Sequence, residues 1–203
     1  MSCIIDHCIQ GSEEWFKKRV GSVGASSINK IITSTGKRST QRKAYMYQLA
    51  GEIITGVKAE SYSNANMEEG VLREQESREL FEFTHNVEIE EVGLILPFEN
   101  AVYHCSPDGI IKGKEEGLEL KNVLASTQVK YLDKNVLPTE YRLQCQFSLF
   151  VTGWDVWHFF TYHPGIKPFY IKVLRDEELI KIIHAEINIF IGELETLVNK
   201  LKQ

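Results

Sequence analysis

Two short segments of this 203-residue chain carry the side chains best suited to phosphodiester chemistry. Asp108 lies in the turn-like sequence Ser-Pro-Asp-Gly, and Glu119, eleven residues later, begins a Glu-Leu-Lys run that ends in Lys121. Carboxylate oxygens are the hard ligands that Mg²⁺ prefers, and a bound metal ion polarises a phosphate and activates water. On a strand, Glu119 and Lys121 point to the same face, so the lysine can reach that water. The pattern indicates a metal-dependent nuclease site.

The same residues also have a purely structural interpretation. Ser-Pro-Asp-Gly is a common turn, and Glu-Leu-Lys fits the solvated face of a half-buried strand. Short motifs match many unrelated sequences, so this spacing alone leaves the structural interpretation ahead. The rest of the chain has to decide between the two.

Composition predicts a soluble globular protein with one domain over residues 1–203, because 43% of residues are hydrophobic and 25% are charged. No apolar run reaches the ~18 residues that a membrane helix needs. The start of the chain lacks the basic and apolar regions of a secretory signal. The four cysteines are scattered without a Cys-x-x-Cys pair, which argues against a zinc or iron–sulfur site and favours free thiols in a reducing cytoplasm.

Charge is unevenly distributed along the sequence. The net charge of −5 argues against a protein that coats nucleic acid indiscriminately. The stretch 36–43, however, holds four cations and no acid in a loop-like composition. Taken alone it is best explained as a solvated loop, but beside a nuclease site it becomes a candidate segment for phosphate contact.

Hydrophobic periodicity predicts helices first, then a mixed sheet, then more helices, which is an α/β pattern. Ser12 and Asp176 are the expected N-caps of the first and last helices. The apolar stripe of the last helix indicates core packing, with an oligomer contact as the alternative. Helices are expected over 13–19, 23–32, 41–55, 67–84, 126–132, 139–151 and 177 onward, and strands over 87–96, 102–106, 109–111, 117–123, 154–162 and 168–174.

Four sequence blocks, taken together and in this order, resemble the phage lambda exonuclease family. These are the YqaJ-type viral recombinases of the restriction-endonuclease-like PD-(D/E)xK fold, whose core is a central mixed β-sheet flanked by helices. The third block alone would fit many nucleases, whereas all four are specific. The blocks are 15–19 with 24–26, 70–74 with 80–84, 105–109 with 117–121, and 141–152.

This resemblance implies a catalytic centre with two Mg²⁺ ions, for which Mn²⁺ is expected to substitute. Asp108, Glu119 and the Leu120 carbonyl would bind metal, and Lys121 would be the catalytic lysine, able to orient or deprotonate water if its surroundings lower its pKa enough. Glu74 would complete the site from a helix, although without the resemblance it would be taken for an exposed helical acid. Two ions about 4 Å apart can stabilise both the attacking and the leaving oxygen.

The family also has a pocket for the terminal 5′-phosphate, and Arg19, Ser26, Ser106 and Gln144 occupy the matching positions. A guanidinium fork with hydroxyl donors suits a dianion, and Ser26 near a helix N-terminus would add free N–H groups. Taken singly, Arg19 would be a helix-end cation and Ser26 a plain cap. Four matches at once favour the pocket.

Five further residues are expected to contact DNA. Tyr141 lies three residues before Gln144, hence on the same helix face, and would reach the scissile end. Met67 falls where the family places an apolar wedge between terminal base pairs, with ordinary packing a close alternative. The basic stretch matches the family only loosely. It supplies the other three candidates, Lys37, Arg38 and Arg42.

The activity implied by the resemblance is a Mg²⁺-dependent 5′-to-3′ exonuclease on double-stranded DNA. It would start preferably from a 5′-phosphorylated end and leave 3′ single strands for single-strand-annealing recombination. The family is phage- or prophage-encoded, acts in the host cytoplasm as a ring-shaped homotrimer around DNA, and works with a single-strand annealing protein. One alternative is a catalytically inactive module of the same fold that binds DNA ends or recruits partners. Another is an iron–sulfur exonuclease, against which the position of the last cysteine, Cys145, argues.

Overall fold

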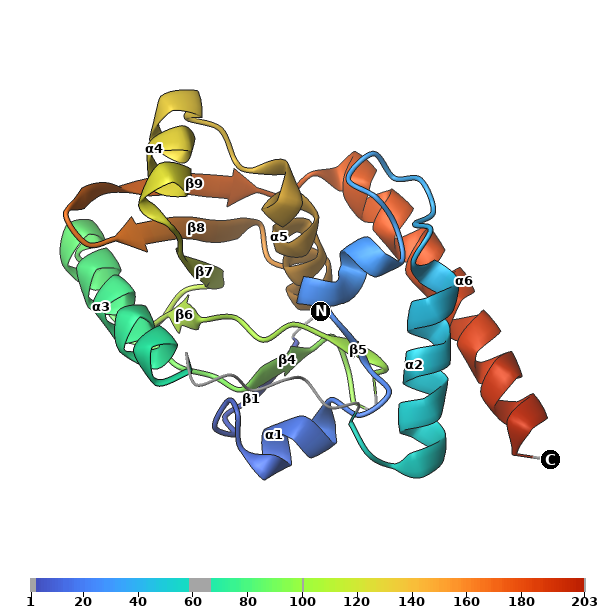
Figure 1. Cartoon of the computed structure of the whole chain (residues 1–203). Helices are drawn as coiled ribbons and strands as arrows, with labels where there is room; N and C mark the ends of the chain where they lie inside the picture. Colours follow the sequence, from blue (N-terminus) through green and yellow to red (C-terminus); the bar gives the residue numbers. More distant parts are fainter. Residues whose placement is uncertain (1–2, 59–66, 100, 203) are drawn as a thin grey trace.

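The structure is a computed structural model that describes residues 3–58, 67–99 and 101–202, with the backbone alone over 67–72 (Figure 1). Its main sheet has five strands in the order β3-β6-β7-β8-β9. Strands β7 and β8 run parallel and the other neighbours run antiparallel, so the expected mixed sheet is confirmed. The five strands are β3 (Ile89–Glu90), β6 (Gly109–Ile111), β7 (Glu116–Asn122), β8 (Val156–His163) and β9 (Ile166–Leu174).

Two small strand pairs tie the N-terminal segment to the middle of the chain. Strand β1 (Ile4–Asp6) pairs antiparallel with β4 (Leu94–Leu96). Strand β2 (Val23–Gly24) pairs parallel with β5 (Tyr103–His104). These pairs place residues 4–6 beside 94–96 and residues 23–24 beside 103–104.

The helix predicted over 23–32 is wrong. Residues 23 and 24 form β2, because Val23 donates its N–H to the Val102 carbonyl at 2.9 Å, and a 3₁₀ helix, η1 (Ala25–Lys30), follows. The buried Ile28 and Ile31 are three residues apart, a spacing that serves a 3₁₀ helix as well as an α-helix. The single strand predicted over 87–96 is likewise two strands, which pair with different partners.

The remaining helices follow the prediction closely. The first and last begin at the expected caps: Ser12 Oγ accepts from Trp15 N at 3.2 Å, and Asp176 Oδ1 accepts from Leu179 N at 3.1 Å. None of the described helices is long and apolar enough to cross a membrane. The helices are α1 (Glu13–Lys18), α2 (Arg42–Thr55), α3 (Met67–His85), α4 (Ala125–Lys134), α5 (Thr139–Thr152) and α6 (Glu177–Leu201).

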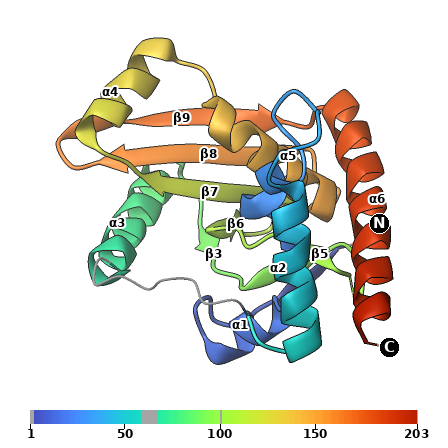
Figure 2. The same cartoon turned by 45° about the vertical axis from the view of Figure 1, so that its right-hand side comes forward.

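Helices cover both faces of the main sheet, with α3 on one face and α4 and α5 on the other (Figures 1 and 2). Successive side chains of β8 point to opposite faces of the sheet, which explains this arrangement. Trp157 and Phe159 point into the larger core beneath α4 and α5, whereas Phe160 meets Phe81 of α3 in a smaller cluster. The sheet is therefore buried on both sides.

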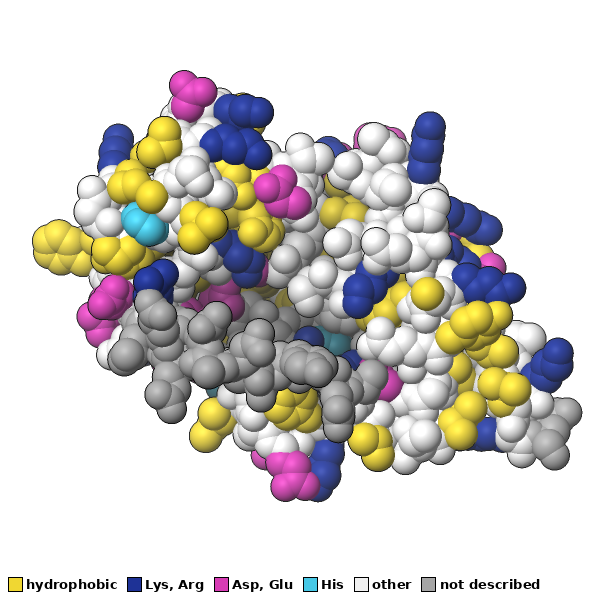
Figure 3. Space-filling view, in the orientation of Figure 1, with side chains coloured by type: hydrophobic (Ala, Val, Ile, Leu, Met, Phe, Trp, Pro, Cys, Tyr) yellow, Lys and Arg dark blue, Asp and Glu magenta, His cyan; other side chains and the backbone are white. Residues whose placement is uncertain are grey.

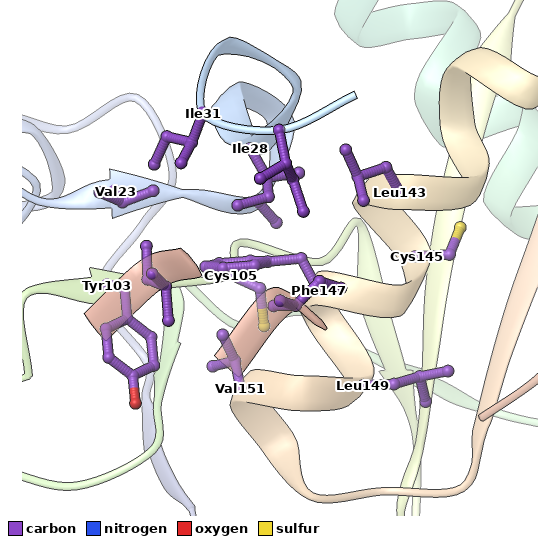
Figure 4. Packing of buried hydrophobic residues seen from close by; sticks show 14 of the residues in the cluster. Val23, Ile28, Ile31, Tyr103, Cys105, Leu143, Cys145, Phe147, Leu149 and Val151 are labelled. Atoms are coloured by element: carbon purple, nitrogen blue, oxygen red, sulfur yellow. The ribbon is translucent and has the colours of Figure 1, made fainter. Parts of the chain in front are cut away.

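Helix α5 connects the larger core to the N-terminal segment. Its Leu143 and Phe147 face Ile28 of η1 and Cys105 after β5 (Figure 4). Helix α6 lies beside α2 (Figure 2), and most of its apolar stripe is buried, which confirms the core interpretation. The buried members are Leu179, Ile180, Ile183, Ile187, Phe190, Leu194 and Val198.

Candidate active site

Strand β7 presents Glu119 and Lys121 on one face of the sheet, as the sequence predicts. The Lys121 ammonium forms an ion pair with a Glu119 carboxylate oxygen. Leu120, between them, points to the opposite face and is buried in the cluster beneath α3. The alternation of the strand thus fixes a carboxylate and an ammonium side by side.

Asp108 is held beside this pair by the turn into β6. Its backbone N–H donates to the Leu118 carbonyl at 3.0 Å, and its carboxylate Oδ2 accepts from Leu120 N at 2.6 Å. The Asp108 carboxylate is therefore hydrogen-bonded to the same strand that carries Glu119. The predicted metal contact of the Leu120 carbonyl stays a prediction.

Burial sets the electrostatics of this centre. It raises the pKa of Asp108, and, with the charge of Asp108 added, it raises the pKa of Glu119 to about 7 despite the neighbouring ammonium. Burial alone would lower the pKa of Lys121, but the charges of Glu119 and Asp108 outweigh it and raise that pKa instead. The lowered pKa that Lys121 would need in order to deprotonate water is therefore not found in this arrangement, and its catalytic role stays a prediction. Lys121 is a fixed cation.

Helix α3 brings Glu74 to the edge of the centre. Burial and the charge of Asp108 raise the pKa of Glu74, and its carboxylate pairs with Arg78 at 2.9 Å. Arg78 also donates from Nε to the Asp108 carbonyl at 3.3 Å. One turn away, Ser77 donates to Asn122 Oδ1 at 2.5 Å and docks the helix on the end of β7.

The carboxylate oxygens of Asp108, Glu119 and Glu74 suit a hard divalent cation, although each carboxylate is bonded to another group of the protein. Within the described ranges, no three His, Cys, Asp or Glu side chains converge as ligands, since Glu74 turns to Arg78 and Glu119 to Lys121. The raised pKa values of half-buried Asp108 and buried Glu119 nevertheless mark two carboxylates with incompletely offset negative charge. Oxygen donors in such a place are what Mg²⁺ requires.

A cleft of about 860 Å³ opens beside the carboxylates. Its wall includes Glu74 and Arg78 of α3, Asp108 just before β6, and residues 7–11. Solvent and small ions therefore have a route to Asp108 from the α3 side.

Two of the four residues predicted to hold a terminal phosphate lie near the N-terminal segment. Arg19, at the C-terminal end of α1, stacks on the Trp15 ring at 3.8 Å and donates from Nε to His104 Nε2 at 3.0 Å. Ser26 is exposed on η1, which has only six residues. The free backbone N–H groups expected near Ser26 would therefore come from a short 3₁₀ helix and not from an α-helix.

The other two predicted phosphate ligands lie closer to the carboxylates. Ser106, two residues before Asp108, has a buried hydroxyl oxygen without a hydrogen-bond partner. Gln144 of α5 donates from Nε2 to Glu119 Oε1 at 2.7 Å. Among the described residues, no hydrogen bond joins any two of the four predicted phosphate ligands to each other, and their shared role stays a prediction.

The candidates for DNA contact divide into two groups. The Tyr141 ring lies beside Phe159, with the Lys121 ammonium 5.8 Å from its centroid, so Tyr141 borders the centre. Arg38 pairs with Glu186 at 2.9 Å, and Arg42 is paired with Glu193. These pairs tie both arginines to α6.

Lys37 and Met67 are the two remaining candidates. Lys37 is exposed, and the side chain of Met67 lies outside the described residues. On the face shown in Figure 3, Lys and Arg side chains are scattered among Asp and Glu. Contact of all these residues with DNA stays a prediction.

Sequence reasoning missed two side chains that touch the predicted residues. Arg78 lies four residues after Glu74, so the pair could have been inferred from helical spacing. His104 lies two residues before Ser106 in a segment predicted as a strand, which places both on one side. Nothing in the sequence indicated that Arg19, 85 positions away, would meet this histidine.

Comparison with known proteins places the chain in a family. Residues 14–155 match the YqaJ-like viral recombinase domain. An alkaline exonuclease (LHK-Exo) from Laribacter hongkongensis superposes with a TM-score of 0.83 at 29% identity, covering 94% of this chain and 96% of that one. The structure of LHK-Exo in complex with dAMP gives the same TM-score at 30% identity, with the same coverage of both chains.

A more distant structure shares the fold alone. A phage related exonuclease from Haemophilus somnus 129PT gives a TM-score of 0.66 at 16% identity, covering 89% of this chain and 96% of that one. No curated protein matches the sequence. With most of its length matched by the family model, the chain belongs to the YqaJ-like viral recombinase family.

Proposed function

We propose that this protein is a Mg²⁺-dependent exonuclease that degrades double-stranded DNA in the 5′-to-3′ direction. The observation that carries the proposal is the pair of neighbouring carboxylates, half-buried Asp108 and buried Glu119, with the Lys121 ammonium paired to Glu119. An alkaline exonuclease with the same fold at 29% identity supports the reaction class. Mn²⁺ would substitute for Mg²⁺, because both accept oxygen ligands.

Mg²⁺ bound at these carboxylates would polarise the phosphodiester and lower the pKa of the attacking water. Asp108 and Glu119 would hold the metal, and Glu74 would join them after leaving Arg78. Lys121, held as a cation, would stabilise the charge that develops on the phosphoryl oxygens and orient the water by hydrogen bonding. Gln144 keeps the Glu119 carboxylate in place through its 2.7 Å hydrogen bond.

The predicted phosphate ligands extend the proposal to the DNA end. Arg19 would bind the terminal 5′-phosphate through charge-assisted hydrogen bonds. The Ser106 hydroxyl, buried and without a partner, would gain one. Digestion from this end would leave 3′ single strands, which are the substrate of a single-strand annealing protein. The enzyme would act as a homotrimer that surrounds the duplex.

Linear duplexes labelled on one strand at either the 5′ or the 3′ terminus test the reaction and its direction. In Mg²⁺ or Mn²⁺ we expect early release of the 5′ label and late release of the 3′ label, with no release in EDTA. Glu119→Gln, purified identically, controls for contaminating nucleases. Early release of the 3′ label would overturn the direction, and binding of duplex ends without cleavage in any metal would indicate an inactive end-binding module.

A further inference from the structure

A buried histidine in contact with the proposed phosphate ligand Arg19 has no role in the reaction described above. His104 is 1% exposed and ends strand β5. The parallel pairing of β5 with β2 sets it opposite Gly24, two residues before Ser26. His104 therefore lies where the segments carrying Arg19, Ser26 and Ser106 meet.

The two hydrogen bonds of the imidazole determine its tautomer. Arg19 Nε can only donate, so His104 Nε2, 3.0 Å away, must be the unprotonated acceptor. The ring proton then lies on Nδ1 and is donated to Ser22 Oγ at 2.7 Å. Burial, with the nearby charges of Arg19 and Lys58, lowers the pKa of His104 to about 3, so the ring stays neutral.

Trp15 and His104 fix the Arg19 guanidinium, whereas its Nη atoms have no hydrogen-bond acceptor among the described residues. Its plane stacks on Trp15, and its Nε–H is taken by His104. In the part of the chain that the structure describes, no carboxylate forms an ion pair with Arg19 and no acceptor is bonded to its Nη atoms. The charge of Glu52 acts on Arg19 without such an ion pair. Half-buried Nη atoms with no bonded acceptor among the described residues therefore remain unfavourable, and an anion at that edge would relieve this.

Hydrogen bonds also fix the backbone around Arg19. The Lys58 ammonium donates to the Arg19 carbonyl at 3.2 Å and to Glu52 at 2.8 Å. Glu52 in turn accepts from Gly21 N at 2.9 Å. A Cβ on Gly24 would lie 3.2 Å from His104 Nε2 and 3.4 Å from Arg19 Nη2, so Gly24 leaves room for the pair.

We propose that His104 is a positioning residue of the terminal-phosphate pocket, binding Arg19 Nε so that the two Nη atoms face the 5′-phosphate end-on. This inference rests on the proposed function, because it takes Arg19 as the phosphate ligand. It adds a prediction that the function alone does not make: discrimination of the DNA end depends on a neutral hydrogen-bond acceptor at position 104.

Two amide substitutions separate the two hydrogen bonds of the ring. In His104→Gln the side-chain oxygen reaches the place of Nε2 and can accept from Arg19. In His104→Asn the shorter amide can keep the contact with Ser22 but cannot reach Arg19. Both variants are polar and similar in size, so a general loss of packing affects them alike.

The measurement is the ratio of digestion rates on 5′-phosphorylated and 5′-hydroxyl duplexes at low and at saturating concentrations of ends. We expect His104→Asn to lower the ratio roughly tenfold, the size expected for one hydrogen bond to a charged group. The loss should appear in KM, with kcat within about twofold of wild type, because the residue does not touch the reacting atoms. His104→Gln should retain the wild-type preference.

Binding of the same two duplexes in EDTA, measured by fluorescence anisotropy, gives a readout without cleavage. His158→Asn is the matched control, since it alters a buried histidine bonded to Tyr170 and Glu116 away from Arg19. It should leave the preference unchanged even if it lowers stability.

The outcomes distinguish the inference from the proposed function. A wild-type enzyme that does not prefer phosphorylated ends would overturn the phosphate pocket itself. If wild type prefers them and Arg19→Lys abolishes the preference, an unchanged ratio in His104→Asn overturns the role of His104 alone. Equal losses in His104→Asn and His104→Gln would show that packing, and not the acceptor, matters.

Discussion

Glu119→Gln should make the metal-free protein more stable at pH 8 while abolishing cleavage. Glu119 is 3% exposed, and its pKa in the folded protein is raised to about 7 from 4.5. The unfolded chain therefore releases this proton more readily than the folded one. As pH rises from 4.5 to about 7, ionisation progressively destabilises the folded state.

The size of the effect follows from that shift. At about 1.4 kcal/mol per pKa unit, the rise to about 7 corresponds to about 3 kcal/mol of lost stability at pH 8. An uncharged amide removes that loss and can still accept the hydrogen bond from Gln144. With roughly 2–4 °C per kcal/mol for a chain of this length, the melting temperature should rise by about 6–12 °C.

Glu52→Gln is the matched control, because its sign should be opposite. Glu52 is 2% exposed, and burial alone would raise its pKa. The hydrogen bonds from Lys58 and Gly21 N outweigh burial and lower that pKa. Ionised Glu52 therefore stabilises the fold above its unfolded pKa, and replacing it with an amide should lower the melting temperature.

Thermal melts in EDTA and in Mg²⁺ measure both variants against wild type. Mg²⁺ should stabilise wild type and have little effect on Glu119→Gln, since a ligand that binds only the folded state raises its stability. If Glu119→Gln is less stable than wild type in EDTA at pH 8, as Glu52→Gln should be, the electrostatic argument for the centre is refuted.

Other substitutions test single features of the structure. Lys121→Met should lower kcat by about 10²–10³, the usual effect of losing one preorganised charge-stabilising donor. Binding of DNA ends, measured by fluorescence anisotropy, should persist. An unaltered kcat would show that Lys121 has no part in the reaction. The pKa of His104 falls to about 3 in the folded protein. Acidification from pH 7 to 4.5 should therefore cost about 3 kcal/mol of stability through this residue. Urea titrations should show that the free energy of unfolding of His104→Gln depends less steeply on pH than that of wild type. Gly117→Ala should destabilise by about 1–3 kcal/mol or more, since its Cβ would lie 2.3 Å from the Trp157 ring; a melt equal to wild type would contradict the packing there.

Much of the fold follows from local sequence patterns. The caps at Ser12 and Asp176 and the alternation along β8 are local signals, and the structure confirms them. The short strands β1, β2 and β5 have two or three residues each, too few for a period to appear, and their pairing depends on partners far along the chain. For that reason β1 was missed and 23–32 was mistaken for a helix.

The candidate site divides in the same way. The facing of Glu119 and Lys121 follows from a spacing of two on a strand. The direction of the Lys121 pKa does not, because it depends on how deeply two carboxylates are buried beside it. The Arg19–His104 contact, which joins the end of α1 to β5, could not be predicted from either segment alone.

The pairing of β1 with β4 and of β2 with β5 has a consequence for synthesis on the ribosome. Both N-terminal strands emerge long before the partners at 94–96 and 103–104 have been made. At roughly 5–20 residues per second, the wait is of the order of several seconds. During that interval the first 30 residues have no sheet to join, so nascent chains released before about residue 105 should be handled as unfolded by proteases and chaperones.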